Sequence, residues 1–193
     1  MIWERYIYQT LKKYFGYESF RDGQEEIITN ILEGKDVLGV LPTGAGKSIC
    51  YQLPALLMDG LTLVISPLIS LMKDQVDSLV EDGISASFIN SSQNFIDYKH
   101  TLDLVKDGKV KILYISPERL ENEYFIDFLK DIKVSLIAVD EAHCISQWGH
   151  DFRPSYKLIP KIYQYLPDIP KAAFTATATR KVREDIIENL KLK

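Results

Sequence analysis

The stretch V-L-G-V-L-P-T-G-A-G-K-S, Val37 to Ser48, joins a short apolar run to a glycine-rich turn. Gly44 and Gly46 allow a tight turn whose backbone N–H groups converge on a concavity, and the helix expected next points its positive end at the same place. Lys47 adds a cation for phosphate groups, and the Ser48 hydroxyl is a ligand for Mg²⁺. The stretch therefore predicts a strand, a phosphate-binding turn and a helix, with the turn built from Thr43, Gly44, Ala45, Gly46, Lys47 and Ser48.

This turn departs from the full phosphate-loop pattern G-x-x-x-x-G-K-[ST], because Leu41 stands where the first glycine belongs. The alternative is a glycine-rich connection between strand and helix that binds no ligand. The adjacent Lys47 and Ser48, taken with an acidic pair later in the chain, favour the phosphate site.

That acidic pair lies in A-V-D-E-A-H-C-I-S-Q-W-G-H-D-F-R-P, Ala138 to Pro154, where an apolar strand delivers Asp140 and Glu141 to the edge of a sheet. One carboxylate can hold Mg²⁺ directly or through water while its neighbour polarises an attacking water. Alone, such a pair is equally typical of a solvated strand end. Together with the phosphate turn it predicts a nucleotide-hydrolysing site, with Ser48 and one of the two carboxylates as the Mg²⁺ ligands.

Short apolar runs without strict polar alternation recur along the chain, and helical stretches separate them. Strands that are buried on both faces have this pattern, so we expect an α/β fold with a mostly parallel sheet and helices on both faces. The helical stretches include residues 69–80 and 178–190, which place apolar residues on one face. The expected strands are Val37–Leu41, Leu61–Ile65, Ala86–Ile89, Val110–Ile115, Val134–Val139 and Ala172–Thr175.

In open sheets of this kind, ligands bind beyond the carboxyl ends of the strands. The Gly44 turn, Ser66, Ser116, Asp140 and Thr175 all fall at such ends. We therefore expect one functional edge, preceded in the chain by a helical segment that ends near residue 34 and followed by a core over 35–193.

Composition bounds the classes of protein that fit. The 193 residues suit one sizeable domain. A net charge of −4 gives no general basic surface for nucleic acid, so any contact with a phosphate backbone must be local. Cys50 and Cys144 show no C-x-x-C spacing, which favours reduced thiols over a metal site or disulfide. No apolar run is long enough to span a bilayer, so we expect a cytoplasmic protein without membrane contact.

Six spaced segments, in this order, closely resemble the first RecA-like lobe of RecQ-family DNA helicases from about Phe15 to the end of the chain. They are F-G-Y-E-S-F-R-D-G-Q (15–24), L-P-T-G-A-G-K-S-I-C-Y-Q (41–52), S-P-L-I-S-L-M-K-D-Q (66–75), S-P-E-R-L (116–120), D-E-A-H-C-I-S-Q-W-G-H-D-F-R-P (140–154) and F-T-A-T-A-T (174–179). The resemblance is specific because it rests on the order of six motifs. It implies a RecA-like P-loop NTPase fold.

The resemblance also implies roles in a site for ATP and Mg²⁺. The residue matching Gln24 hydrogen-bonds the edge of adenine, and those matching Tyr17 and Arg21 enclose its ring, which suits a carboxamide and two planar groups. Without the resemblance, Tyr17 and Arg21 are typical of a surface aromatic and a solvated charge. Lys47, Ser48 and Asp140 then hold MgATP, Glu141 orients water, and His143 links the site to neighbouring motifs.

Other segments are similar to motifs that meet DNA. Ser66, Lys73, Ser116 and Arg119 match groups that contact the phosphate backbone or brace such contacts without reading sequence. Ser66 and Ser116 also precede prolines, so helix capping is an alternative that is compatible with the first. The segment Thr175-Ala176-Thr177 resembles the motif that couples hydrolysis to strand separation, although threonines at a strand end also follow from β-propensity alone.

The loop after the acidic pair resembles the aromatic-rich loop through which the family couples DNA binding to hydrolysis. Trp148 and Phe152 would stack on unpaired bases, and Arg153 would contact a phosphate. The alternative is that both aromatics are core residues. The surrounding polar residues show no helical or strand period, which favours a mobile loop. The coupling residues expected here are Gln147, Trp148, His150, Phe152 and Arg153.

The resemblance implies the ATP-binding lobe of an ATP-dependent 3′-to-5′ DNA helicase, which acts on single-stranded and duplex DNA in repair and recombination. We expect the second RecA-like lobe, the zinc cluster and the C-terminal module to be absent from this chain, so that the lobe binds ATP but does not unwind DNA. A P-loop kinase or nucleotide transferase is an alternative, but no substrate lid is apparent. A nucleic-acid-binding module with vestigial motifs is another, and the intact Lys47, Ser48 and Glu141 argue against it.

Overall fold

In the computed structural model, which describes residues 2–166 and 168–193, the strands form one sheet in the order β1-β6-β5-β2-β4-β3. Every pair of neighbouring strands is parallel. The α/β fold with a parallel sheet is thus confirmed, and each expected strand is present with ends moved by at most two residues. The strands are β1 Val37–Val40, β2 Leu61–Ile65, β3 Ala86–Ile89, β4 Ile112–Ile115, β5 Val134–Val139 and β6 Lys171–Thr175.

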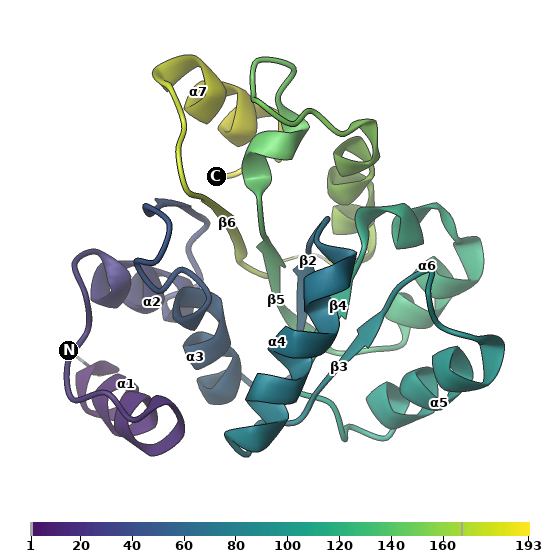
Figure 1. Ribbon diagram of the computed structural model, residues 1–193, viewed down its shortest axis with the longest axis horizontal. Helices are drawn as coiled ribbons and strands as arrows, with labels where there is room; N and C mark the ends of the chain where they lie inside the picture. Colours follow the sequence, from purple (N-terminus) through teal and green to yellow (C-terminus); the bar gives the residue numbers. More distant parts are fainter. Residues whose placement is uncertain (1, 167) are drawn as a thin grey trace.

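Helices cover both faces of this sheet (Figure 1). One face packs against α2 (Gln24–Leu32), α3 (Ile49–Leu57) and α4 (Ile69–Glu81). The other packs against α5 (Phe95–Lys106), α6 (Glu123–Lys130), α7 (Arg180–Asn189) and the 3₁₀ segment Pro154–Tyr165. Further 3₁₀ segments run over Pro117–Glu121 and Ala142–Ile145.

The amino-terminal segment adds a third, smaller core. Helix α1 (Glu4–Thr10) continues as one π-helical segment, Leu11–Phe15. Ile7 and Leu11 from this segment pack against Ile28 of α2 and Leu53 of α3, and all four are buried. This packing holds α2 and the turn before it beside the phosphate-binding turn.

The central strands explain why the sequence shows apolar runs rather than alternation. All five residues of β2 are buried. Leu63 and Ile65 belong to one core cluster and Val64 to the other, so successive side chains enter opposite cores.

Neither Ser66 nor Ser116 caps a helix through its side chain, which was the alternative to a role in DNA contact. Helix α4 begins after Leu68, not Ser66, and the Ser66 Oγ instead accepts a hydrogen bond from the Leu68 N–H at 3.2 Å. Ser116 stands before the 3₁₀ segment Pro117–Glu121 but makes no side-chain cap. By contrast, the Thr179 Oγ1 accepts from the Val182 N–H at 3.3 Å, which starts α7 two residues later than its apolar pattern suggests.

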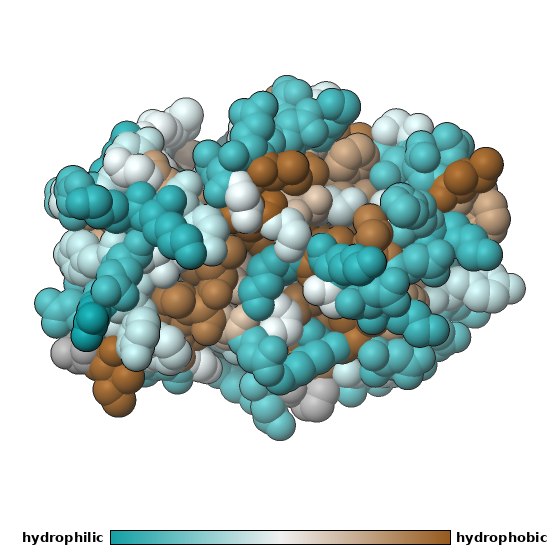
Figure 2. Space-filling model, turned by 90° about the horizontal axis from the view of Figure 1, so that it is seen from below, coloured by the Kyte–Doolittle hydropathy of each residue, from teal (hydrophilic) through white to brown (hydrophobic). Residues whose placement is uncertain are grey.

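The surface seen from below in Figure 2 is largely hydrophilic, with separate hydrophobic areas between the polar side chains. No helix of the described residues is both long and apolar enough to cross a membrane.

Candidate functional site

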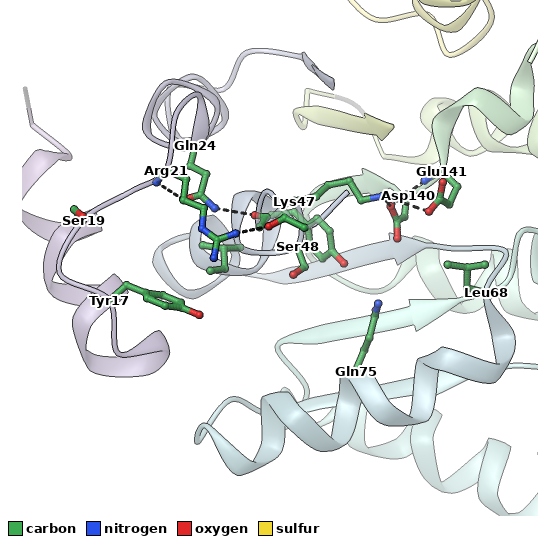
Figure 3. Close-up of a pocket in the computed structure, with 14 residues that line it drawn as sticks. Tyr17, Ser19, Arg21, Gln24, Lys47, Ser48, Leu68, Gln75, Asp140 and Glu141 are labelled. Atoms are coloured by element: carbon green, nitrogen blue, oxygen red, sulfur yellow. Dashed lines mark hydrogen bonds and ion pairs between the residues drawn. The ribbon is translucent and has the colours of Figure 1, made fainter. Parts of the chain in front are cut away.

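A pocket of about 470 Å³ opens beside the phosphate-binding turn, between the segment before α2, the end of β5 and α4 (Figure 3). It brings together predicted residues from three distant parts of the sequence. Its lining includes Tyr17, Arg21, Gln24, Gly44, Gly46, Lys47, Ser48, Asp140 and Glu141. The remaining residues of the turn, Thr43 and Ala45, do not line the pocket.

The turn needs its glycines for two different reasons. Gly44 and Gly46 have φ angles of +83° and +75°, in the left-handed region that favours glycine. A Cβ on Gly44 would meet nothing within 4 Å, but one on Gly46 would lie 2.4 Å from the Gln24 Nε2. Gly46 therefore also makes room for the side chain that packs against the turn.

Lys47 is the cation of the pocket. Its Nζ lies 2.8 Å from the Asp140 Oδ1 and 3.4 Å from the Glu141 Oε1. Partial burial by itself lowers the pKa of Lys47, but the charges of Asp140 and Glu141 outweigh it and raise that pKa above its ordinary value. Lys47 is therefore a charged ammonium within reach of any anion that enters.

The two carboxylates are held differently. Asp140 is 4% exposed, its Oδ1 accepts the Glu141 N–H at 2.9 Å, and its carbonyl oxygen accepts the Tyr156 hydroxyl at 2.8 Å. Glu141 adopts a left-handed backbone with φ 49° and ψ 47°, uncommon outside glycine. This turn directs the chain into the 3₁₀ segment Ala142–Ile145 immediately after the strand, so consecutive carboxylates both reach the pocket.

The oxygens here suit Mg²⁺. The Ser48 hydroxyl and the Asp140 carboxylate line the same pocket, and Mg²⁺ is typically held by one or two protein oxygens together with substrate phosphates. No group of three or more His, Cys, Asp or Glu in the described part of the chain could hold a metal ion by itself. The Ser48 hydroxyl and the Asp140 carboxylate are thus suited to bind Mg²⁺ that is also coordinated by the phosphates of a nucleotide.

His143 lies behind the carboxylates and is 4% exposed. Its Nδ1 is 2.8 Å from the Thr175 Oγ1 at the end of β6 and 3.5 Å from the Glu141 Oε2. The Thr175 hydroxyl in turn donates to the Thr177 carbonyl at 3.2 Å. Burial lowers the pKa of His143 against the opposing charge of Glu141, which favours a neutral ring. His143 thereby joins the carboxylate to the Thr175-Ala176-Thr177 segment.

Two of the residues expected to bind adenine, Arg21 and Gln24, form hydrogen bonds with the phosphate-binding turn. Gln24 is 2% exposed, its Oε1 accepts the Arg21 N–H at 2.8 Å, and its Nε2 donates to the Gly46 and Ala45 carbonyls at 2.9 and 3.3 Å. The Arg21 guanidinium donates to the Gly44 carbonyl, whereas Tyr17 is half exposed at the side of the pocket (Figure 3). The amide of Gln24 thus braces the turn in addition to facing the pocket, which the sequence did not predict.

The residues expected to meet DNA lie at other points on the same sheet edge. Ser66 and Ser116 are buried at the ends of the neighbouring strands β2 and β4. Lys73 lies on the exposed side of α4, 2.7 Å from Asp77. The Arg119 guanidinium lies over the Tyr98 ring, 4.7 Å from its centroid, and its buried Nε has no hydrogen-bond partner among the described residues. The two serine side chains are therefore less accessible than Lys73.

The aromatic-rich loop exposes Trp148 and partly buries Phe152. Trp148 is 63% exposed, so the alternative that it is a core residue is wrong. The Phe152 ring lies under the Lys157 ammonium, 5.5 Å from its centroid, and Arg153 pairs with Asp151 at 3.1 Å. Gln147 and His150 are exposed.

The loop, which the sequence predicts to be mobile, makes two contacts with neighbouring segments. The His150 ring stacks on His143 with centroids 4.1 Å apart, and the Ser146 hydroxyl donates to Asp185 of α7 at 2.6 Å. The role of α7 was missed, because nothing in its sequence distinguishes the partner of a loop from an ordinary charged helix face.

The sequence of this chain is similar to those of known helicases. A family model described as DEAD/DEAH box helicase matches residues 21–186. The chain is 54% identical over 183 residues to "ATP-dependent DNA helicase RecQ" of Haemophilus influenzae, covering 95% of this chain and 30% of that protein. It is also 54% identical over 182 residues to the protein of the same description from Bacillus subtilis, covering 93% of this chain and 31% of that protein. The resemblance to RecQ-family helicases is thereby confirmed, and the chain spans roughly 30% of the length of these relatives.

Solved structures give the same fold at lower identity. A hypothetical ATP-dependent RNA helicase from Sulfolobus tokodaii superposes with a TM-score of 0.70 at 21% identity, covering 97% of this chain and 54% of that chain. The DUF1998 helicase MrfA bound to DNA and AMPPNP gives a TM-score of 0.72 at 18% identity, covering 98% of this chain and 28% of that chain.

Proposed function

The chain belongs to the DEAD/DEAH box helicase family, and on that premise we propose that it is the ATP-binding lobe of a RecQ-like, ATP-dependent 3′-to-5′ DNA helicase. The observation that carries the proposal is the convergence of Lys47, Ser48, Asp140 and Glu141 on one pocket. A phosphate-binding turn and a water-polarising carboxylate in the same cavity are what nucleotide hydrolysis requires.

In this proposal the Lys47 ammonium exchanges its carboxylate partners for the outer phosphates of ATP. The backbone N–H groups of the turn contribute further donors. Ser48 and Asp140 hold Mg²⁺, which when bound neutralises charge on the phosphates. Glu141 orients the attacking water, and the neutral His143 keeps the Glu141 carboxylate aligned with the end of β6.

Base recognition belongs to the segment before α2. Tyr17 and Arg21 enclose the adenine ring and Gln24 binds its edge, which gives a preference for ATP over GTP. Since Gln24 also bonds the Gly46 carbonyl, we infer that adenine binding and the shape of the phosphate-binding turn depend on each other.

DNA binding belongs to the remaining part of the sheet edge. Lys73 and Arg119 supply charge for the phosphate backbone, with Ser66 and Ser116 bracing the loops that carry them. Trp148 and Phe152 stack on unpaired bases. Thr175 and Thr177 couple this DNA binding to His143.

Translocation and unwinding need a second RecA-like lobe that closes on the nucleotide and supplies an arginine. Such an arginine is worth about 10³–10⁵ in rate. We therefore propose that residues 1–193 form the first lobe of a two-lobe cytoplasmic helicase, with residues 1–34 as the adenine-recognition segment. By itself this lobe binds MgATP, hydrolyses it very slowly and does not unwind duplex DNA.

Equilibrium binding of ATP and GTP to this chain tests the nucleotide site. We expect ATP to bind more tightly than GTP and Lys47→Ala to abolish detectable binding. Lys73→Ala is the matched control, because Lys73 is an exposed lysine outside the pocket. GTP binding as tight as ATP binding would contradict the role of Gln24, and unaltered ATP binding by Lys47→Ala would contradict the site itself.

ATPase rates with and without single-stranded DNA, measured on a two-lobe protein in which this chain is the first lobe, test the wider proposal. Stimulation by DNA is the expected result. Robust unwinding by the purified chain alone would refute the division into lobes.

A further inference from the structure

Helix α7 lies beside the aromatic-rich loop, although 26 or more residues of chain separate them in sequence through the segment Pro154–Tyr165 and β6 (Figure 1). The contact is built on Ser146, which is 0% exposed. Its Oγ donates a hydrogen bond to the Asp185 Oδ2 at 2.6 Å and accepts one from the Trp148 N–H at 3.1 Å. One hydroxyl therefore ties the main chain at Trp148 to a carboxylate of α7.

The same face of α7 also contacts the ring of Trp148. The Lys181 ammonium lies 3.3 Å from the centroid of the indole ring, and Lys181 and Asp185 are four residues apart on one helix. Cation–π attraction of this kind favours one placement of the ring. Trp148 nevertheless remains 63% exposed, so a large part of the indole is open to a ligand.

The carboxylate of Asp185 is suited to fixing the loop. An O–H···O⁻ bond of 2.6 Å is in the short range of charge-assisted hydrogen bonds, which are about twice as strong as neutral ones. The other oxygen, Oδ1, accepts from the Asn189 Nδ2 at 3.0 Å, so the carboxylate itself is oriented. Asp185 and Ser146 thus form a short, directional connection rather than a flexible surface pair.

This connection leads back to the nucleotide site. Trp148, His150 and His143 line a second pocket together with Thr177 and Thr179, which precede α7. His150 stacks on His143, and His143 contacts both Thr175 and Glu141. The loop that carries Trp148 is thereby connected, through His150 and His143, to Glu141.

We propose that Asp185 is a positioning residue of the proposed DNA-coupled ATPase: through Ser146 it holds Trp148 where an unpaired base can reach it. The expected effect on ATPase activity rests on the proposed function. The expected placement of Trp148 by Asp185 does not. Loss of the Asp185–Ser146 bond leaves Trp148 exposed and displaced. Single-stranded DNA then has to order the loop before it can act, which weakens apparent DNA affinity without changing the nucleotide pocket.

The first experiment measures the local motion of Trp148 by time-resolved fluorescence anisotropy. Trp148 is one of only two tryptophans, so a Trp3→Phe background isolates its signal. Asp185→Ala and Ser146→Ala should each give a faster local decay. Asp185→Asn keeps an oxygen acceptor for Ser146 but loses the charge-assisted bond, so its decay should lie between those of the parent and of Asp185→Ala. Glu184→Ala is the matched control, because Glu184 is the neighbouring carboxylate on α7 and pairs with Arg180 rather than with Ser146.

The second experiment measures ATPase in the two-lobe protein as a function of single-stranded DNA concentration. Asp185→Ala should raise the DNA concentration for half-maximal stimulation roughly tenfold, equivalent to about 1.4 kcal/mol. The rate without DNA and the KM for ATP should stay at the parent values. The effects of Ser146→Ala and Asp185→Ala should add to less than their sum in the double variant, because the two substitutions share the Ser146–Asp185 bond, while Ser146→Ala alone also removes the acceptor of the Trp148 N–H.

Thermal unfolding separates positioning from general stability. An Asp185→Ala variant with unchanged Trp148 decay, or with lower stability but parental DNA dependence in its folded fraction, would overturn the inference. Should Asp185→Ala not fold, Ser146→Ala, which removes one oxygen atom, carries the same comparison. A parent protein without DNA stimulation would refute the proposed function, and the fluorescence result would still decide whether Asp185 positions Trp148.

Discussion

Replacing Gln24 with glutamate tests the contact between the adenine-recognition segment and the phosphate-binding turn with almost no change in shape. The amide nitrogen of Gln24 donates to the Gly46 and Ala45 carbonyls, while its oxygen accepts the Arg21 N–H. A carboxylate retains the accepting contact and loses both donating ones. It also places negative charge against two carbonyl oxygens in a site that is 2% exposed.

The expected cost follows from these contacts. A buried acceptor left without its donor costs about 1–3 kcal/mol, and the second bond is the longer one, so we expect Gln24→Glu to destabilise the chain by about 2–4 kcal/mol. For a domain of this size, with m near 2–3 kcal/mol/M in urea, that is a fall of roughly 1 M in the urea midpoint. ATP affinity should fall as well, because the turn loses its brace.

The deficit should also depend on pH. Burial beside carbonyl oxygens raises the pKa of the introduced carboxyl above its unfolded value, so the contribution of this group to stability is present at low pH and lost as pH rises through the folded-state pKa. Protonated, the carboxyl can again donate to the Gly46 carbonyl. The difference between variant and parent should therefore be larger at pH 8 than at pH 5.

Urea unfolding followed by circular dichroism at these two pH values provides the measurement. Gln75→Glu is the control, because Gln75 lines the same pocket from α4 and makes none of these contacts with the turn. A Gln24→Glu protein with the parental midpoint, or a deficit equal to that of Gln75→Glu at both pH values, would refute the bracing role.

Further predictions concern other parts of the site. In a two-lobe protein, Trp148→Ala should strongly lower DNA-stimulated ATPase with little change in DNA-free nucleotide affinity or melting temperature; a large loss of stability would mean that the ring is a structural residue. Because burial lowers the pKa of His143, the unfolded chain binds a proton that the folded chain resists, so stability should fall as pH drops from 7.5 to 5.5, by at most about 1.4 kcal/mol per pH unit, and His143→Gln should flatten that slope in urea titrations. Burial raises the pKa of both Cys50 and Cys144 to about 12, so iodoacetamide at pH 8 should label neither thiol in the native protein and both in urea, as read by mass spectrometry; rapid native labelling would contradict their burial.

The sheet was predictable because its signals are local. Each apolar run, such as Leu61–Ile65, is bounded by turn residues. The sequence from Gly44 to Ser48 by itself indicates a turn between a strand and a helix. The order of the strands was not predictable to the same extent, because it depends on which crossover packs on which face. Nothing in residues 37–40 indicates that their partner is the last strand.

Within the site, residue types were predictable and their partners were not. A Gly-Lys-Ser sequence predicts affinity for phosphate, but not that Lys47 pairs with Asp140, since that depends on how β5 lies beside the turn. The contacts of Gln24 with Gly46 and of Ser146 with Asp185 are similar cases. They are set by side-chain direction in the folded chain, which sequence spacing does not encode.

The pairing of the first strand with the last has a consequence for how the protein is made. In the described part of the chain, β1 lies at the edge of the sheet and pairs with β6, with Val37 opposite Ala172. At about 5–20 residues per second, a ribosome needs on the order of ten seconds to synthesise the residues between them. Throughout that time the strand that carries the phosphate-binding turn has no partner within the sheet. The strand that carries the phosphate-binding turn can therefore complete its pairing in the sheet only after all the other strands have been synthesised.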